Sequence, residues 1–315
     1  MPTSYLIVDE LKEMSIWFFL IILIFYAGEM IWKEKSIKIS GVTDALPMSD
    51  LINLGGKFIG LLLVYVILLV SLMIAGILFQ TISGYYNYDL KVYFTALFLE
   101  VFPFLTLYTF MIFFFQIVSN SKFVGHVLML LFFLVTVSMG FLGFNHGLIK
   151  FGGISLNTYS EMNGYGHFLQ PYLLNKIYWF AFCMLIFLLT VLLNVRGVNI
   201  SIKNRIQLIR QRAKGSVVNL GTVVLMTFIA SGSIIFYNTN ILNRYFTTSD
   251  KEQFRVAYEA NLKKFEYLNQ PKITAVNLKV DLFTSERNYT DGGFFNLENQ
   301  GQSNIDQIYI QKYIS

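Results

Sequence analysis

The sequence contains little cysteine and little charge. A single cysteine, Cys183, excludes a disulfide framework, a zinc site built from cysteines and an iron–sulfur cluster, because each of these needs several thiols. Only 14% of the 315 residues are charged and 55% are hydrophobic, whereas about 25% of the residues in soluble domains are charged. So few charges cannot cover the surface of two water-soluble domains. The composition therefore predicts that much of the chain lies in a membrane.

Six apolar runs are long enough to cross a bilayer, whose hydrocarbon core of about 30 Å needs about 20 helical residues. Backbone polar groups find no water in that core, so the spans must be helices. The sequence thus predicts an all-α polytopic membrane protein with about six transmembrane helices, in a membrane domain formed by residues 1–239. The expected spans are 15–32, 58–80, 92–118, 123–143, 173–195 and 217–237.

Lysine and arginine gather in alternate connections between these spans. The basic connections are the first, the third and the fifth, and the positive-inside rule makes them cytoplasmic and both termini extracytoplasmic. Their bases are Lys33, Lys35, Lys38, Lys57, Lys122, Arg196, Lys203, Arg205, Arg210, Arg212 and Lys214. The net charge of +5 arises entirely in residues 1–239, where 15 Lys and Arg face 10 Asp and Glu. The basic excess therefore indicates membrane topology, and no nucleic-acid partner is expected.

The composition changes after the last span, in residues 240–315. A helix is expected over 250–268 and is ended by Pro271, and apolar residues then alternate with polar ones between Val276 and Leu282, as in a half-buried strand. A turn is expected at Asp291–Gly293, and further strands at 294–297 and 308–310. We expect a short, incomplete α/β extension outside the membrane.

Motifs of metal and nucleotide chemistry are missing. No HExxH occurs, so the sequence offers no zinc-bound water with a glutamate base. Gly55-Gly56-Lys57 is followed by Phe58 instead of Ser or Thr, which excludes a phosphate-binding loop. We expect no cofactor, no metal and no enzymatic activity in this chain. The alternative is a membrane enzyme that uses His146, Glu161 and His167. A folded outer cap or short re-entrant helices explain these residues better, because Asn-Gly-Tyr-Gly (163–166) is turn chemistry and not a helix that presents ligands.

Residues 33–57, KEKSIKISGVTDALPMSDLINLGGK, resemble the first cytoplasmic loop of type-2 ABC exporter permeases. Four further stretches strengthen the likeness. They are FYAGEMIWKEK (25–35), GFNHGL around His146, YSEMNGYGHF (159–168) and QPKITAVNLKVDL (270–282). Together and in this order they resemble bacterial permeases that are fused to an extracytoplasmic zinc aminopeptidase of the gluzincin class. The chain then looks like the permease half plus a linker helix and the first strands of the peptidase portion.

The resemblance implies a permease that is coupled to a separate cytoplasmic ABC ATPase, in the plasma (inner) membrane of a bacterium. A second permease half or a homodimer would be needed to enclose a path. The coupling helix is expected within residues 37–50, where Pro47 ends it. The residues assigned to ATPase coupling are Glu34, Asp44, Ala45, Leu46, Pro47, Ser49 and Lys57. The alternative is a membrane anchor that holds an aminopeptidase domain without transport.

Glu100 is a carboxylate inside the third expected span. Such a group costs about 2.5–3.5 kcal/mol near the bilayer centre on insertion scales, so we expect it to face the helix bundle or a wet cavity. Pro103 lies nearby and leaves a backbone carbonyl free for another partner. Glu100 is therefore a candidate for the transport path. The alternative is a hydrogen-bonded residue that only packs helices together.

Overall fold

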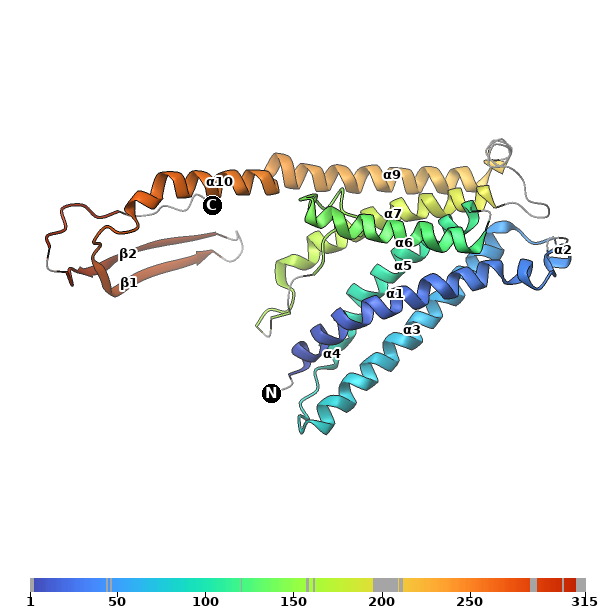
Figure 1. The fold of residues 1–315 in the computed structure, drawn as a ribbon, viewed down its shortest axis with the longest axis horizontal. Helices are drawn as coiled ribbons and strands as arrows, with labels where there is room; N and C mark the ends of the chain where they lie inside the picture. The colour runs from blue at the N-terminus through green and yellow to red at the C-terminus, as the bar shows by residue number, and fades with distance from the viewer. Residues whose placement is uncertain are drawn as a thin grey trace. The chain divides into compact units, whose positions relative to one another are not determined.

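The computed structural model describes residues 3–43, 45, 47–119, 121–156, 159–160, 162–194, 209, 212–283, 288–301 and 303–309. These residues form two compact units, Met1–Thr248 and Ser249–Ser315. The regular elements described in the first unit are all helices. Those described in the second unit are one α-helix, a short 3₁₀ turn and a two-stranded sheet (Figure 1).

Six helical segments of the first unit are long and apolar enough to cross a bilayer, which confirms the predicted polytopic all-α fold. The segments are α1 (Ser4–Ser36), α3 (Asp50–Ile82), the continuous run α4 (Leu90–Phe94), η1 (Thr95–Val101) and α5 (Phe102–Val118), α6 (Lys122–Phe141), η2 (Gly166–Phe168) with α7 (Leu169–Leu193), and α9 (Ser216–Phe236) with η3 (Tyr237–Leu242). Helix α2 (Ser40–Thr43) is a short turn between the first two spans. The elements η1 and η3 are π-helical, and η2 is a 3₁₀ turn.

Helices α1 and α3 are longer than the apolar runs that predict them. Each has 33 residues, or about 50 Å at 1.5 Å per residue, whereas the hydrocarbon core is about 30 Å thick. Their polar ends must therefore project from the membrane. Hydrophobicity marks only the part of a helix that contacts lipid, because a helix that continues into water no longer needs apolar side chains there.

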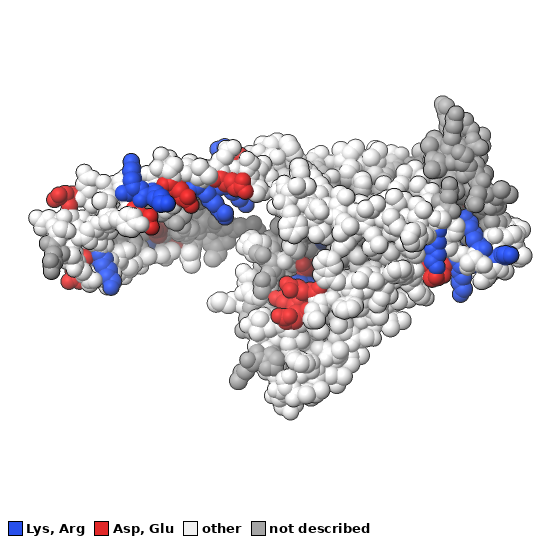
Figure 2. All heavy atoms as spheres, in the orientation of Figure 1, with Lys and Arg blue, Asp and Glu red and all other residues white. Residues whose placement is uncertain are grey.

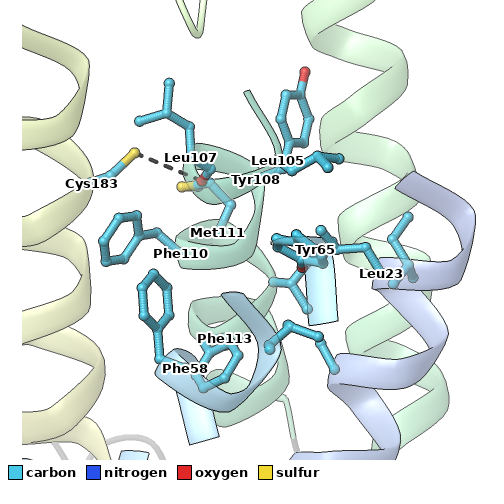
Figure 3. Packing of buried hydrophobic residues seen from close by; sticks show 14 of the residues in the cluster. Leu23, Phe58, Tyr65, Leu105, Leu107, Tyr108, Phe110, Met111, Phe113 and Cys183 are labelled. Carbon is cyan, nitrogen blue, oxygen red and sulfur yellow. Dashed lines mark hydrogen bonds between the residues drawn. The ribbon is translucent and has the colours of Figure 1, made fainter. Parts of the chain in front are cut away.

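Helix α5 lies at the centre of the bundle and packs against α1, α3, α6 and α7 (Figure 1). In the apolar part of the span that contains α5, 67% of the residues are buried, whereas in that of α9 only 11% are buried. The ring of Phe58 packs against Phe110, with 4.4 Å between ring centroids, and against Phe187 at 5.3 Å. Figure 3 shows Phe58, Tyr65 and Phe110 within this core. The buried hydroxyl of Tyr65 lies 2.9 Å from that of Thr109, so these two polar atoms are paired.

The outward faces of the spans are strongly apolar. Helix α3 exposes a regular row of aliphatic side chains at helical spacing, each 42–65% exposed: Ile59, Leu63, Ile67, Val70, Ile74 and Leu78. Figure 2 shows a wide uncharged band over the spans, with basic side chains gathered at the end that carries α2. Such a surface is stable against lipid and unstable in water, so the structure supports a multi-pass membrane protein.

The second unit contains α10 (Thr248–Leu262), the 3₁₀ turn η4 (Lys263–Phe265) and the antiparallel strands β1 (Lys272–Phe283) and β2 (Asn288–Glu298). The expected helix and the first expected strand are both present. The apolar residues of β1 remain about half exposed, with Val276 at 53% and Leu278 at 51%. Two strands alone cannot bury these side chains.

Two predictions for this unit are wrong. Asp291–Gly293 is not a turn, because it lies within β2. Gly293 pairs with Leu278, and a Cβ atom on it would come within 2.1 Å of the carbonyl oxygen of Asn277. Glycine here permits close approach of two backbones instead of reversing the chain. Ile308 lies outside any strand, and Ile310 lies outside the described residues.

Candidate functional site

Glu100 lies where the helical run from α4 to α5 is locally irregular. Pro103 has no backbone N–H, so the carbonyl of Leu99, four residues earlier, loses its usual partner. The phenol of Tyr172 on α7 donates a hydrogen bond to that carbonyl. The preceding residues, Thr95–Val101, form the wider π-helical turn η1, which often occurs at functional positions. The proline and the tyrosine together explain why the helix widens at Glu100.

Glu100 contacts helix α1 and not lipid. Its Oε2 lies 3.0 Å from Nζ of Lys12, which also lies 3.2 Å from Oδ1 of Asp9. The side chain of Glu100 is 12% exposed and that of Lys12 18%. Lys12 precedes the first expected span, which begins at residue 15, but α1 begins at Ser4 and brings Lys12 against η1. A pair of opposite charges at this depth avoids the cost of an isolated ion.

Tyr165 lies beside this pair, in the connection between α6 and α7, which is expected to be extracytoplasmic and is called the outer connection below. Tyr165 hydrogen-bonds Thr95 of η1, and burial raises the pKa of its hydroxyl. The hydroxyl therefore remains neutral at physiological pH. It can donate or accept a hydrogen bond near Glu100 without adding a charge.

A second buried cation, Lys176 on α7, was missed because it lies in an otherwise uncharged apolar run. The residue is 8% exposed. Its Nζ donates to the carbonyl oxygen of Gly152 at 2.7 Å and lies 4.8 Å from the centre of the Tyr172 ring. A lysine that is the single charge in a 25-residue apolar helix is a signal that the sequence did contain.

The outer connection around residues 144–156 folds down onto α7. The amide of Asn175 donates to Gly147 and accepts from the backbone of Ile154, at 3.1 and 3.2 Å. Trp179 also donates to the Gly147 carbonyl, at 3.0 Å. Gly153 has a positive φ of 71°, and a Cβ on it would come within 1.4 Å of the Asn175 oxygen. Only glycine allows this close approach.

His146 is part of this folded connection, and both of its ring nitrogens are engaged in hydrogen bonds, so neither is free to bind a metal. Its Nδ1 accepts from the backbone N–H of Leu148 at 3.2 Å, so Nε2 carries the proton and donates to Asn240 Oδ1 at 3.1 Å. His167 stacks on its neighbour Phe168, and Glu161 lies outside the described residues. Within the described ranges, no three His, Cys, Asp or Glu side chains could hold a metal ion together.

The end of the bundle that the basic residues predict to be cytoplasmic brings several of the predicted coupling residues together. Nζ of Lys57 on α3 lies 2.7 Å from Oε1 of Glu34 on α1, and Oγ1 of Thr43 donates to Glu34 Oε2 at 3.4 Å. Ser49 caps α3 by accepting from the N–H of Ile52 at 3.2 Å. Ala45 and Pro47 are exposed, whereas Asp44 and Leu46 lie outside the described residues. One ion pair thus joins the two helices that flank the connection.

The first turn of this connection is unusually sharp. Lys38 adopts a left-handed conformation with φ of 59°. The N–H of Ile39 bonds the Glu34 carbonyl at 3.0 Å and that of Lys38 bonds Lys35 at 3.2 Å, as in a Schellman cap. Beyond the turn, several apolar side chains remain exposed: Ile37, Ile39, Val42 and Met48 at 53%, 42%, 71% and 38%.

A third polar cluster, also missed by sequence analysis, joins α1, α5 and α6 near this end. Trp32 donates to Oε1 of Gln116 at 2.9 Å, and Glu29 pairs with Lys122. Gln116 and His126 are 1% and 8% exposed. Among the described residues, their Nε2 atoms meet no hydrogen-bond partner. The close packing depends on small residues, because a Cβ on Gly28 would come within 2.2 Å of His126.

Comparisons with known proteins do not add to this picture. No protein-family model matches the chain, and searches of the curated proteins and of the solved structures return no match. The resemblance to peptidase-fused permeases therefore stays a prediction from the sequence motifs.

Proposed function

We propose that this chain is the membrane-spanning permease component of an ABC transporter, driven by a separate cytoplasmic ATPase. The membrane is the plasma membrane of a bacterium, and both termini face outward. In this proposal the chain contributes no catalytic chemistry, and a second six-span unit completes the path. Residues 249–315 form an extracytoplasmic portion.

The apolar surface of the first connection carries this proposal. Its four exposed apolar side chains lie between α1 and α3, next to the basic residues that favour the cytoplasmic side. They lie beyond the apolar run that crosses the bilayer, so lipid does not cover them. An exposed apolar patch with charged neighbours is typical of a protein-docking site. A membrane anchor has no need of such a patch.

The bracing of the connection supports a mechanical role. The Glu34–Lys57 pair fixes the two ends of the connection against each other, and the Schellman cap at Lys38 fixes the direction in which the chain leaves α1. A displacement of α2 by a partner would therefore reach α1 and α3 directly. A connection without these bonds would absorb the displacement. Glu100, paired to α1, lies on the helix run that contacts both α1 and α3.

The test is site-specific crosslinking in membranes of the native cell. Because Cys183 is the only cysteine and is buried, a second cysteine can be labelled selectively. A photoreactive crosslinker is attached at Val42→Cys and, as the matched control, at Tyr86→Cys in the opposite connection. These side chains are 71% and 70% exposed, so accessibility does not separate them.

The expected product is an adduct between Val42→Cys and a protein that carries a Walker A motif, with no such adduct from Tyr86→Cys. ATP with vanadate should change the yield, because nucleotide closes the ATPase against the connection. Failure to find an ABC ATPase in the Val42→Cys product would contradict the permease proposal and favour the anchor. An adduct from Tyr86→Cys alone would reverse the proposed orientation.

A further inference from the structure

A groove opens between η1 and α5, α7 and α9. Its volume is about 560 Å³, and its walls are apolar except at Tyr172, Lys176 and Thr227. The outer rim is exposed, with Leu173 at 41% and Ile177 at 50%. Because these helices cross the bilayer, the occupant of the open side of the groove is lipid and not water.

The groove has the length of an acyl chain. Its wall on α7 extends from Tyr172 to Met184, which is about 18 Å at 1.5 Å per residue. The apolar wall includes Phe110, Phe180 and Val224 from three different helices. Helix α9 is the least buried span of the described chain. A molecule in the groove would therefore contact a helix that the protein itself covers poorly.

One end of the groove carries a cation without a carboxylate partner. No carboxylate among the described residues forms an ion pair with Lys176. Glu100 acts on its charge from a distance, but Lys12 already holds Glu100. The end of the groove therefore holds an ammonium whose nearest hydrogen-bond partner is the Gly152 carbonyl.

The position of the ammonium fits the boundary between lipid headgroups and chains. Side chains of a helix point toward its N-terminus, which for α7 is the end that bears the outer connection. The Lys176 ammonium reaches the carbonyl of Gly152 in that connection. This is the snorkelling arrangement that places the charged head at the interface and the apolar stem along the groove.

We propose that this groove binds an anionic phospholipid of the outer leaflet, with one acyl chain along α7 and the phosphate beside Lys176. The Lys176 ammonium selects an anionic headgroup, and the apolar walls require a chain. The lipid fills the space between α5 and α9 and holds α9 against the bundle. This site belongs to the chain itself and does not depend on transport or on an ATPase.

The test is lipid binding to the purified full chain in a neutral detergent, measured by native mass spectrometry. Phosphatidylglycerol and phosphatidylcholine with identical acyl chains are titrated in parallel. Both lipids carry the phosphate, but the choline of phosphatidylcholine cancels its charge, so the Lys176 ammonium predicts a preference for phosphatidylglycerol of roughly tenfold. Lys176→Met should remove most of this preference, whereas Lys176→Arg should keep it. Lys91→Met, an exposed lysine at the same end, is the control and should leave the preference unchanged.

A second pair of variants tests the apolar part of the groove and protects against misfolding of the lysine variant. Thr227 lines the groove from an exposed position on α9, and Thr222 is exposed on the same helix away from the groove. Thr227→Phe should lower the binding of both lipids, and Thr222→Phe should not. Equal lipid preference in Lys176→Met, or equal binding by the two phenylalanine variants, would overturn the site. Glycerol phosphate has the phosphate but no acyl chain, so binding of glycerol phosphate as tight as that of phosphatidylglycerol would also overturn the site.

Discussion

The pair formed by Lys12 and Glu100 allows a quantitative prediction that depends on which partner is removed. Nζ of Lys12 lies 3.0 Å from Glu100 and 3.2 Å from Asp9. Glu100→Gln therefore leaves Lys12 with a second carboxylate. Lys12→Met instead leaves Glu100 at 12% exposure with no cation, while Asp9 at 38% is partly hydrated. The lysine substitution should be the more damaging of the two.

The magnitudes follow from the cost of a buried charge without a partner. Removal of one member of such a pair costs about 3–5 kcal/mol, and we expect Lys12→Met to fall in this range. We expect Glu100→Gln to cost roughly 1–2 kcal/mol, since a hydrogen bond to the lysine remains possible. The double variant carries no unpaired buried charge and should regain much of the loss. For a domain of 150–250 residues, about 3 kcal/mol corresponds to a fall in Tm of roughly 6–12 °C.

Thermal unfolding of the detergent-purified variants measures this double-mutant cycle. Lys91→Met and Glu13→Gln are the matched controls, because both side chains are exposed on the same two helical segments. Each control should change Tm by no more than about 1–2 °C, as expected of surface substitutions. The measurement is made at one detergent and lipid ratio, since bound lipid stabilises the folded state.

The outcome that refutes the reasoning is a Glu100→Gln variant that is less stable than Lys12→Met. In that case Asp9 does not stabilise the Lys12 charge, and the arrangement described for Asp9, Lys12 and Glu100 is wrong. Strict additivity in the double variant would also refute it, because two residues in contact must show a coupling energy. Stability that responds as expected, together with normal ATP-driven transport, would assign Glu100 to helix packing and not to a path.

Two further predictions concern the helix break and the close packing of α1. Tyr172→Phe removes the donor to the Leu99 carbonyl and should destabilise the chain by about 1–3 kcal/mol, measured as a fall in Tm. Gly28→Ala forces a methyl group against His126 and should cost about 1–3 kcal/mol. Gly60→Ala meets nothing within 4 Å and should be neutral or stabilising by up to about 1 kcal/mol. The same sign for both glycine variants would contradict the packing described for α1 and α6.

The sequence predicted the number and type of the spans because a bilayer leaves little choice. A backbone in hydrocarbon must satisfy its own hydrogen bonds, so each apolar run of sufficient length becomes a helix. The same argument gives no information about where a helix ends in water, and α1 and α3 are accordingly longer than expected. In the second unit, Asp291–Gly293 has turn chemistry but lies in a strand, because strand pairing outweighed the local preference.

The candidate sites were predictable only where function leaves a local pattern. The first connection was identified from its resemblance to permease loops, its proline and its flanking charges, and the structure brings Glu34 and Lys57 into contact. The cluster around Gln116 and His126 has no such pattern, since its members come from three helices. Lys176 did leave a signal, as a lone charge in an apolar run, but a count of hydrophobic residues conceals it.

By itself the sequence determined that much of the chain lies in lipid, that the fold is helical, and which side of the membrane each connection is expected to face. These inferences depend on composition and on the pattern of residues along the chain. Only the tertiary structure decided how each embedded charge is compensated. Glu100 meets Lys12 from 88 residues away, whereas Lys176 meets a backbone carbonyl and no carboxylate among the described residues. A charged residue inside an apolar run is visible in the sequence, because both are local features. The partner that compensates its charge is not visible, because it depends on which helices pack together.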